Sequence, residues 1–257
     1  MKILLTVSYV GTAYQGYQLQ NDKPTVALEL NRAVRRVFGF ECLVTGCSRT
    51  DSGVHTLGYR VSVEPASAEN KITVPTDKIP AAMNTVLPRD ISVLSAMEVD
   101  DGFHPRYSVV KKEYVYRIRA SVVRDPFLAD KVYEYGKSID TLSVENMKMA
   151  AERFIGTHNF DAFMASGSSV TDTRRTVYES YITVCGDIIE YHVAADGFLY
   201  NMVRIMVGTL LQVGRGKLAP SDITRIIESK NRALAGSTAR AEGLYLKKVY
   251  YDFDMNK

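Results

Sequence analysis

The segment GCSRTDSGVH, residues 46–55, contains several side chains suited to acid–base or nucleophilic chemistry. Arg49 and Asp51 are two residues apart, so in extended backbone they share one face and can form an ion pair. A neighbouring cation keeps a partly desolvated carboxylate ionised. Gly53 suits the positive φ of a turn that presents Asp51 at the end of a strand. Asp51 is therefore a candidate nucleophile or base, and His55 a candidate substrate contact.

The same motif also has a purely structural interpretation, in which Asp51 accepts hydrogen bonds from its own backbone in a turn. A metal site is not expected. Cys42 and Cys47 are five residues apart in an apparent strand, and the four histidines show no ligand spacing. The segment VGRGK, residues 213–217, lacks the spacing of a phosphate-binding loop. We therefore expect no metal and no nucleotide cofactor.

Basic and aromatic residues are interleaved in DGFHPRYSVVKKEYVYRIRA, residues 101–120. On a strand Tyr114 and Tyr116 share one face, where they either pack in a core or form a platform for a splayed RNA base. Cations suited to phosphate contacts occur here and in TDTRRTVYES: Arg106, Lys111, Lys112, Arg174 and Arg175.

Arg204 lies in FLYNMVRIMVG, a strongly apolar helical pattern. A guanidinium in such a helix needs a partner, because burying an unpaired charge is costly. One interpretation is a buried structural ion pair, and the other is an arginine directed at an anion in a binding cleft.

The composition is that of an ordinary globular protein, with 257 residues, 46% hydrophobic and 24% charged. The formal charge of +3 permits a nucleic-acid partner without requiring one. Three cysteines suggest free thiols in a reducing compartment. We find no signal-like or membrane-spanning run and expect a cytoplasmic protein.

The periodicities predict an α+β protein in which the order β-α-β-β-α-β occurs twice. Strands are expected at 2–9, 41–46, 56–64, 91–99, 113–120, 175–184, 188–195 and 244–253, and helices at 25–38, 76–86, 143–155, 199–213 and 221–229. This order predicts two ferredoxin-like halves, residues 1–106 and 107–257, whose antiparallel sheets meet to form a central basic cleft.

With these residues in view, the chain resembles the TruA family of tRNA pseudouridine synthases. SRTDSGVH is similar to the family's catalytic motif, usually written GRTDAGVH. Six further segments occur in the family's order: YVGTAYQGYQLQ, NTVLP, FHPRYS with KKEYVY, RRTV, FLYNMVRIMVG and AEGLYL. Any one of them is weak evidence, whereas the series along nearly the whole chain is specific.

The resemblance implies a homodimeric, cofactor-free enzyme that isomerises uridine to pseudouridine in the anticodon stem-loop of tRNA. It places the catalytic aspartate at Asp51 and the motif arginine at Arg49. It also implies that Tyr114 contacts the base, that Arg204 is the helix arginine, and that Leu246 lies against the base. Asp51 would attack C1′ or C6, or take a proton from C2′, and the sequence leaves these three open.

The chain departs from the family pattern at four positions. Ser48 and Ser52 replace a glycine and an alanine of the motif, and both are small enough to preserve the turn. Tyr17 and Leu19 stand where the family often has tryptophan and arginine, a change expected to affect tRNA contacts more than chemistry.

Two other classes of protein compete with the synthase. An RNA-binding paralogue with altered catalysis would retain the fold but act on a different RNA. A glycoside hydrolase also breaks a bond at C1′, but it normally needs two carboxylates, and no acidic partner for Asp51 is evident.

Overall fold

The computed structural model describes residues 1–167 and 170–255 of a mixed α+β protein. The chain forms two compact units. The first unit comprises Met1–Val110 together with the chain from Tyr245 onward, and the second comprises Lys111–Leu244.

This division differs from the expected boundary between residues 106 and 107, because the C-terminal strand belongs to the first unit. Strand β10 (Leu244–Tyr250) pairs in parallel with β3 (His55–Pro65), with Tyr245 opposite His55 and Leu246 opposite Thr56. Such a return of the chain leaves no mark on the local sequence pattern.

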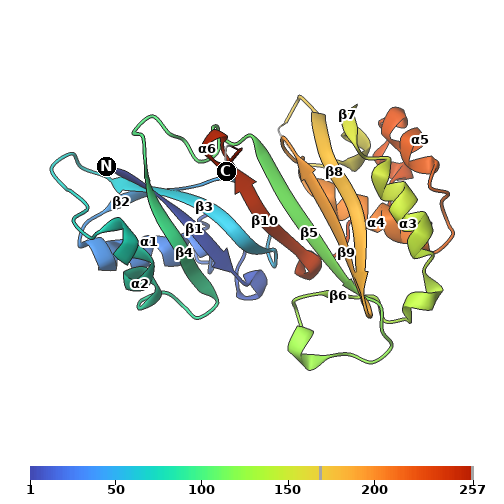
Figure 1. Cartoon of the computed structure of the whole chain (residues 1–257), viewed down its shortest axis with the longest axis horizontal. Helices are drawn as coiled ribbons and strands as arrows, with labels where there is room; N and C mark the ends of the chain where they lie inside the picture. The colour runs from blue at the N-terminus through green and yellow to red at the C-terminus, as the bar shows by residue number, and fades with distance from the viewer. Residues whose placement is uncertain (168–169, 256–257) are drawn as a thin grey trace. The chain divides into compact units, whose positions relative to one another are not determined.

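The first unit has the predicted order of strands and helices. The elements are β1 (Lys2–Tyr9), α1 (Val26–Phe38), β2 (Cys42–Gly46), β3, α2 (Ile79–Asn84) and β4 (Ile91–Val99). The sheet order is β4-β1-β3, with β2 also on β3, and all these pairs are antiparallel. Helix α1 packs on β2, α2 packs on β4, and the helices contact each other, so they cover the same face of the sheet (Figure 1).

Local signals set the ends of α1 as predicted. The Thr25 side chain accepts a hydrogen bond from the Leu28 amide at 3.3 Å, and Gly39 ends the helix with a φ of 80°. In β3, the alternate residues Tyr59, Val61 and Val63 are fully buried and form the inward face of the strand.

The second unit contains mostly antiparallel strands. Its elements are β5 (Lys111–Arg119), β6 (Tyr133–Glu134), α3 (Val144–Glu152), β7 (Gly156–Asn159), β8 (Arg174–Cys185), β9 (Ile188–Ala195), α4 (Met202–Gly214) and α5 (Asp222–Ser229). The strand order is β5-β9-β8-β7, and β6 pairs in parallel with β5. Figure 1 shows α3, α4 and α5 gathered beside this sheet.

Several element boundaries were predicted incorrectly. Helix α4 begins at Met202 rather than at residue 199, and α3 ends at Glu152 rather than at residue 155. After β10 the chain forms the short helix α6 (Asp252–Met255) instead of continuing as a strand. Short 3-10 helices, also unpredicted, occupy Gly11–Ala13, Thr76–Lys78, Pro126–Leu128, Ile139–Thr141, Asp161–Phe163, Arg232–Leu234 and Ala241–Gly243.

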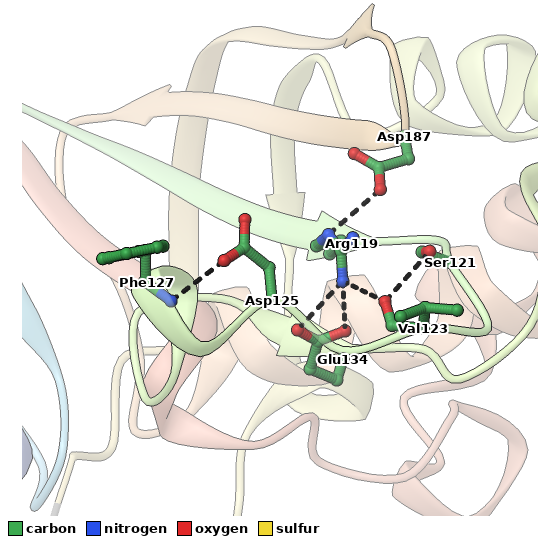
Figure 2. A network of polar contacts seen from close by, with 7 residues as sticks. All are labelled: Arg119, Ser121, Val123, Asp125, Phe127, Glu134 and Asp187. Carbon is green, nitrogen blue, oxygen red and sulfur yellow. Dashed lines mark hydrogen bonds and ion pairs between the residues drawn. The ribbon is translucent and has the colours of Figure 1, made fainter.

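A polar network centred on Arg119 holds the long loop between β5 and β6 (Figure 2). The guanidinium donates to the Val123 carbonyl at 2.6 Å and pairs with Glu134 at 3.4 Å and Asp187 at 3.0 Å. The loop nevertheless exposes apolar side chains, with Phe127 85% exposed. Polar contacts at its base, rather than apolar burial at its tip, therefore order the loop.

Replacing Arg119 with methionine is expected to loosen this loop. Two carboxylates lose their partner, so the free energy of unfolding should fall by about 1–3 kcal/mol. Trypsin cleavage after Arg124 or Lys131 should become faster, as measured by timed digestion under native conditions. Arg117→Met is the matched control, because Arg117 lies on β5 like Arg119 and pairs with Glu190 of β9, outside the loop network. Equal digestion of the two variants would contradict the assignment.

Candidate active site

Asp51 lies in the connection between β2 and β3 and is half-buried. The turn closes where the Val54 amide donates to the Asp51 carbonyl at 3.2 Å. Gly53 has a φ of 78°, which confirms the positive φ predicted for it. The turn therefore carries the Asp51 carboxylate just before the first residue of β3.

Arg49 is exposed, and among the described residues no ion pair joins it to Asp51. The predicted pairing within the motif is thus not formed. The expectation required an extended segment around Asp51, whereas the chain turns directly after this residue. The Arg49 guanidinium remains accessible to an external anion.

The N-terminal loop, residues 11–17, makes several hydrogen bonds to the Asp51 turn. The Tyr14 carbonyl accepts from the Gly53 amide at 3.4 Å and from the Ser52 hydroxyl at 3.2 Å. The Tyr9 hydroxyl, at the end of β1, bonds the Thr50 side chain at 2.8 Å. With the bond from the Tyr17 amide to the Thr50 carbonyl at 3.3 Å, these contacts fix the backbone on both sides of Asp51. Residues 11–17 are the part of the site that sequence reasoning missed.

Two glycines make this close contact possible. A Cβ atom on Gly11 would overlap the Val54 carbonyl, and one on Gly16 would overlap the Thr50 carbonyl. Gly16 also has a φ of 84°, which a side chain disfavours. The glycines in YVGTAYQGY are the signal that could have revealed the contact.

His55 is fully buried at the start of β3. Its Nδ1 accepts a hydrogen bond from the Gly11 amide at 2.9 Å, and its ring lies 4.6 Å from the ring of Tyr245. The side chain thus anchors the N-terminal loop to the strand that follows the turn. The structure thus gives His55 a positioning role, and its contact with substrate stays a prediction.

Tyr17, one of the positions where the chain departs from the family pattern, has a buried side chain. Tyr17 is 7% exposed, and its ring packs on that of Tyr59 with centroids 4.5 Å apart. The Tyr59 hydroxyl bonds the backbone of Ser48, and burial raises the pKa of Tyr59 well above its usual range, so it stays a donor. Leu19, by contrast, is 54% exposed. Of the two departures, only that at Leu19 exposes its side chain to solvent.

Ser52→Ala is expected to be nearly neutral. The Ser52 hydroxyl donates to the Tyr14 carbonyl, but Ser52 is exposed, and the Gly53 amide bonds the same carbonyl. The free energy of unfolding should fall by no more than about 1 kcal/mol. Chemical denaturation and single-turnover rates, compared with wild type, would check this. A loss of rate with unchanged stability would instead assign the hydroxyl a role in the reaction.

Leu246 and Arg106 also belong to the first unit. Leu246 is fully buried on β10, and its carbonyl accepts from the Thr56 hydroxyl at 2.9 Å. Its strand is therefore tied to β3 directly beyond the Asp51 turn. Arg106 is exposed, and its amide donates to His104 at 3.1 Å. The first unit thus brings Leu246 to the strand that follows Asp51 and leaves Arg106 on its surface.

Tyr114 lies on β5 in the second unit, opposite Val193 of β9, and is 8% exposed. Its ring meets that of Phe198 edge-on at 4.9 Å. Tyr116 is fully buried, and its hydroxyl donates to the Arg240 carbonyl at 2.8 Å. Of the two tyrosines predicted to share a face, Tyr116 is therefore a core residue.

Arg204 is half-buried on α4 and has the partners that the apolar helix made necessary. Its Nε donates to the Ala239 carbonyl at 2.7 Å, and its Nη1 donates to the Asn201 side chain at 2.7 Å. The Ala239 amide returns a bond to the Arg204 carbonyl at 3.0 Å. These contacts hold the guanidinium in one orientation.

The remaining predicted cations all lie on strands of the second unit. Lys111 pairs with Glu179 at 3.3 Å, and Lys112 follows it on β5. Arg174 is exposed at the start of β8, and Arg175 donates to the Asp172 carbonyl at 2.9 Å. The predicted site residues are thus distributed over both units.

No helix among the described residues is long and apolar enough to cross a membrane. No group of three or more His, Cys, Asp or Glu side chains within 1–167 and 170–255 is arranged to hold a metal ion. All three cysteines are free, and burial raises the pKa of the Cys42 thiol to about 11. Cys42 is therefore protonated at neutral pH.

Comparison with known proteins relates the chain to RNA-modifying enzymes. A family model described as tRNA pseudouridine synthase matches residues 150–252. A tRNA pseudouridine synthase A of Thermoanaerobacter sp. is 44% identical, covering 97% of this chain and 99% of the relative. One of Bacillus subtilis is 40% identical, covering 98% of this chain and all of the relative.

Among solved structures, a chain from a Cbf5-Nop10-Gar1 complex is similar with a TM-score of 0.35. It is 13% identical and covers 81% of this chain and 54% of that chain. A likeness this low carries no argument about the site. The two synthase relatives show the family of this chain, because their sequence identity extends over nearly its whole length. The chain therefore belongs to the TruA family of tRNA pseudouridine synthases.

Proposed function

We propose that this chain isomerises uridine to pseudouridine in the anticodon stem-loop of tRNA, with Asp51 as its catalytic carboxylate. The observation that carries the proposal is the presentation of Asp51, half-buried on a turn that the N-terminal loop holds on both sides. Relatives at 40–44% identity named tRNA pseudouridine synthase A support the substrate and the reaction.

The reaction breaks the N1–C1′ bond of uridine, rotates the uracil and joins C5 to C1′. N1 gains a proton and C5 loses one, so atoms and electrons balance without an oxidant or reductant. One positioned carboxylate suffices for each of three routes: attack at C1′, attack at C6, or proton removal from C2′. In every route the detached uracil must be retained, and the target nucleotide must first leave its stack.

The proposal assigns the second-unit residues to retention and orientation. The face of Tyr114 would hold the uracil, with the ring oriented by its edge contact with Phe198. The guanidinium of Arg204 is fixed by Ala239 and Asn201, so it is preorganised for an anionic partner. Leu246, which belongs to the first unit, would limit the movement of the base by apolar contact.

Exposed cations would hold the RNA backbone. Arg49, Arg106 and Arg174 are exposed and suit phosphate contacts, whereas Lys111, Lys112 and Arg175 would contribute to the local positive potential. Two ferredoxin-like halves that enclose a basic cleft remain part of the proposal. The antiparallel order β4-β1-β3, with β2 on β3, supports this architecture for the first unit.

Tritium release from C5 of uridine in unmodified tRNA transcripts tests the function. We expect the wild-type protein to release tritium to water and to form pseudouridine without free uracil. Free uracil would indicate a glycoside hydrolase. Binding of tRNA without release or product would favour the RNA-binding paralogue, and Leu19 would then be the first position to examine.

Homodimerisation and a cytoplasmic location complete the proposal. The dimer rests on the family resemblance, and the location also draws support from the three free cysteines. Light scattering at micromolar concentration should give twice the mass of the 28.7 kDa chain. A monomer active at the same concentration would remove the dimer from the proposal and leave the chemistry intact.

A further inference from the structure

A second candidate site lies in the second unit, at the C-terminal end of α4. A cavity of about 260 Å³ is lined by that end of the helix, by Tyr133 of β6 and by the segment 237–240. Its polar lining consists of Gln212, Arg215, Lys217, Ser237, Thr238, Arg240 and Tyr133. None of these residues has been given a part in the isomerisation.

The walls of this cavity are built rigidly. A Cβ on Gly208 would overlap the Ser237 carbonyl, and one on Gly236 would overlap the backbone of Gly208. The backbone of segment 236–237 is therefore in van der Waals contact with the backbone of α4. The Gly236 amide donates to the Thr209 hydroxyl at 2.8 Å, which in turn donates to the Ile205 carbonyl at 2.8 Å. The segment that follows Gly236 therefore cannot move freely against α4.

The cavity lining is strongly electropositive. It includes Arg215, Lys217 and Arg240, all of which are exposed, and no acidic residue, and the Arg215 guanidinium also lies 5.0 Å from the centre of the Tyr135 ring. The carboxylate of Glu242 lies 3.7 Å from Arg240 but is not part of the lining. Three cations around one concavity raise the local concentration of anions and favour an anionic ligand.

Hydroxyl groups at the cavity suit an oxyanion. Ser237 and Thr238 both line it. Arg232 donates to the Thr238 oxygen at 3.4 Å, which leaves the Thr238 proton available to an acceptor. Cations combined with hydroxyl donors are the groups that proteins use for nucleic-acid phosphates. The volume is below the range typical of drug-sized ligands and fits a phosphate with part of its ribose.

We propose that this cavity binds a backbone phosphate of the RNA substrate outside the target nucleotide. This inference rests on the proposed function. Arg204 and Arg215 are eleven residues apart on α4, roughly 16 Å along the helix axis. Ala239, which lines the cavity, also accepts the bond from Arg204. A phosphate held here would anchor the RNA at a point separate from the uridine and at the segment that orients Arg204.

The test compares a double variant, Arg215→Ala with Lys217→Ala, against a matched control. The control is Lys148→Ala with Arg153→Ala, which removes two positive charges from α3 and its C-terminal end, at residues that do not line the cavity. The dissociation constant for unmodified tRNA is measured from 50 to 200 mM salt. A lost phosphate contact should lower the slope of log Kd against log salt by about one and weaken binding several-fold at low salt.

The control should keep both the wild-type slope and the wild-type rate in single turnover. Equal slopes for the two double variants would overturn the proposal. Inorganic phosphate distinguishes the source of the anion. If phosphate raises the melting temperature of wild type but not of the cavity variant, while the RNA slopes agree, the site takes a free anion and the RNA assignment is wrong.

The outcome is separable from a failure of the proposed function. Tritium release by the wild-type protein is scored independently of the salt slopes. A wild type that releases tritium while the cavity variant shows an unchanged slope refutes only the second site.

Discussion

Asp51→Asn is expected to abolish tritium release from tRNA, with a rate at least about 10⁴-fold below wild type. Asparagine has nearly the size of aspartate, so the half-buried position should tolerate it sterically. What is lost is the anionic oxygen, which every one of the three routes requires. Single-turnover tritium release at saturating tRNA is the measurement, because it separates chemistry from binding.

The control for this variant is its dissociation constant for tRNA. The turn is held by backbone atoms of Asp51 and Thr50 and by the side chains of Ser52 and Thr50, all of which the substitution retains. We therefore expect the tRNA dissociation constant to change by less than about threefold and the melting temperature to change little. An asparagine variant that releases tritium within tenfold of the wild-type rate would exclude Asp51 as the catalytic carboxylate.

The turn that carries Asp51 was largely predictable from sequence, because the residues that form it are neighbours in the chain. Gly53 supplies the positive φ, and the residues around it define where β2 ends and β3 begins. Helix α1 was predictable for the same reason, since Thr25 and Gly39 act on their immediate neighbours. Local signals of this kind are independent of what the rest of the chain does.

The contacts that hold the turn were not predictable, because they join segments distant in sequence. Gly11 meets the residues around His55 across more than forty positions, and β10 returns to β3 from the far end of the chain. Alternation suggested an ion pair between Arg49 and Asp51, but it takes no account of the turn that begins directly after Asp51.

Gly16→Ala is the second substitution with a large expected effect. Gly16 has a φ of 84°, and an added Cβ would overlap the Thr50 carbonyl, one residue before Asp51. Relieving this overlap requires the Thr50 carbonyl to move, and the Asp51 turn moves with it. Displacement of a catalytic group by about 1 Å can cost about 100-fold in rate, so we expect a loss of that order in single turnover.

Gly39→Ala is the matched control, because it separates backbone strain from displacement of the turn. Gly39 has a φ of 80°, and a Cβ there would meet no atom within 4 Å. Both alanines carry the left-handed backbone cost of about 1–2 kcal/mol, seen in chemical denaturation. Only Gly16→Ala should also lose rate. Equal rates would mean that the turn absorbs the added atom, and that the N-terminal loop, although it touches the turn, does not set the position of Asp51.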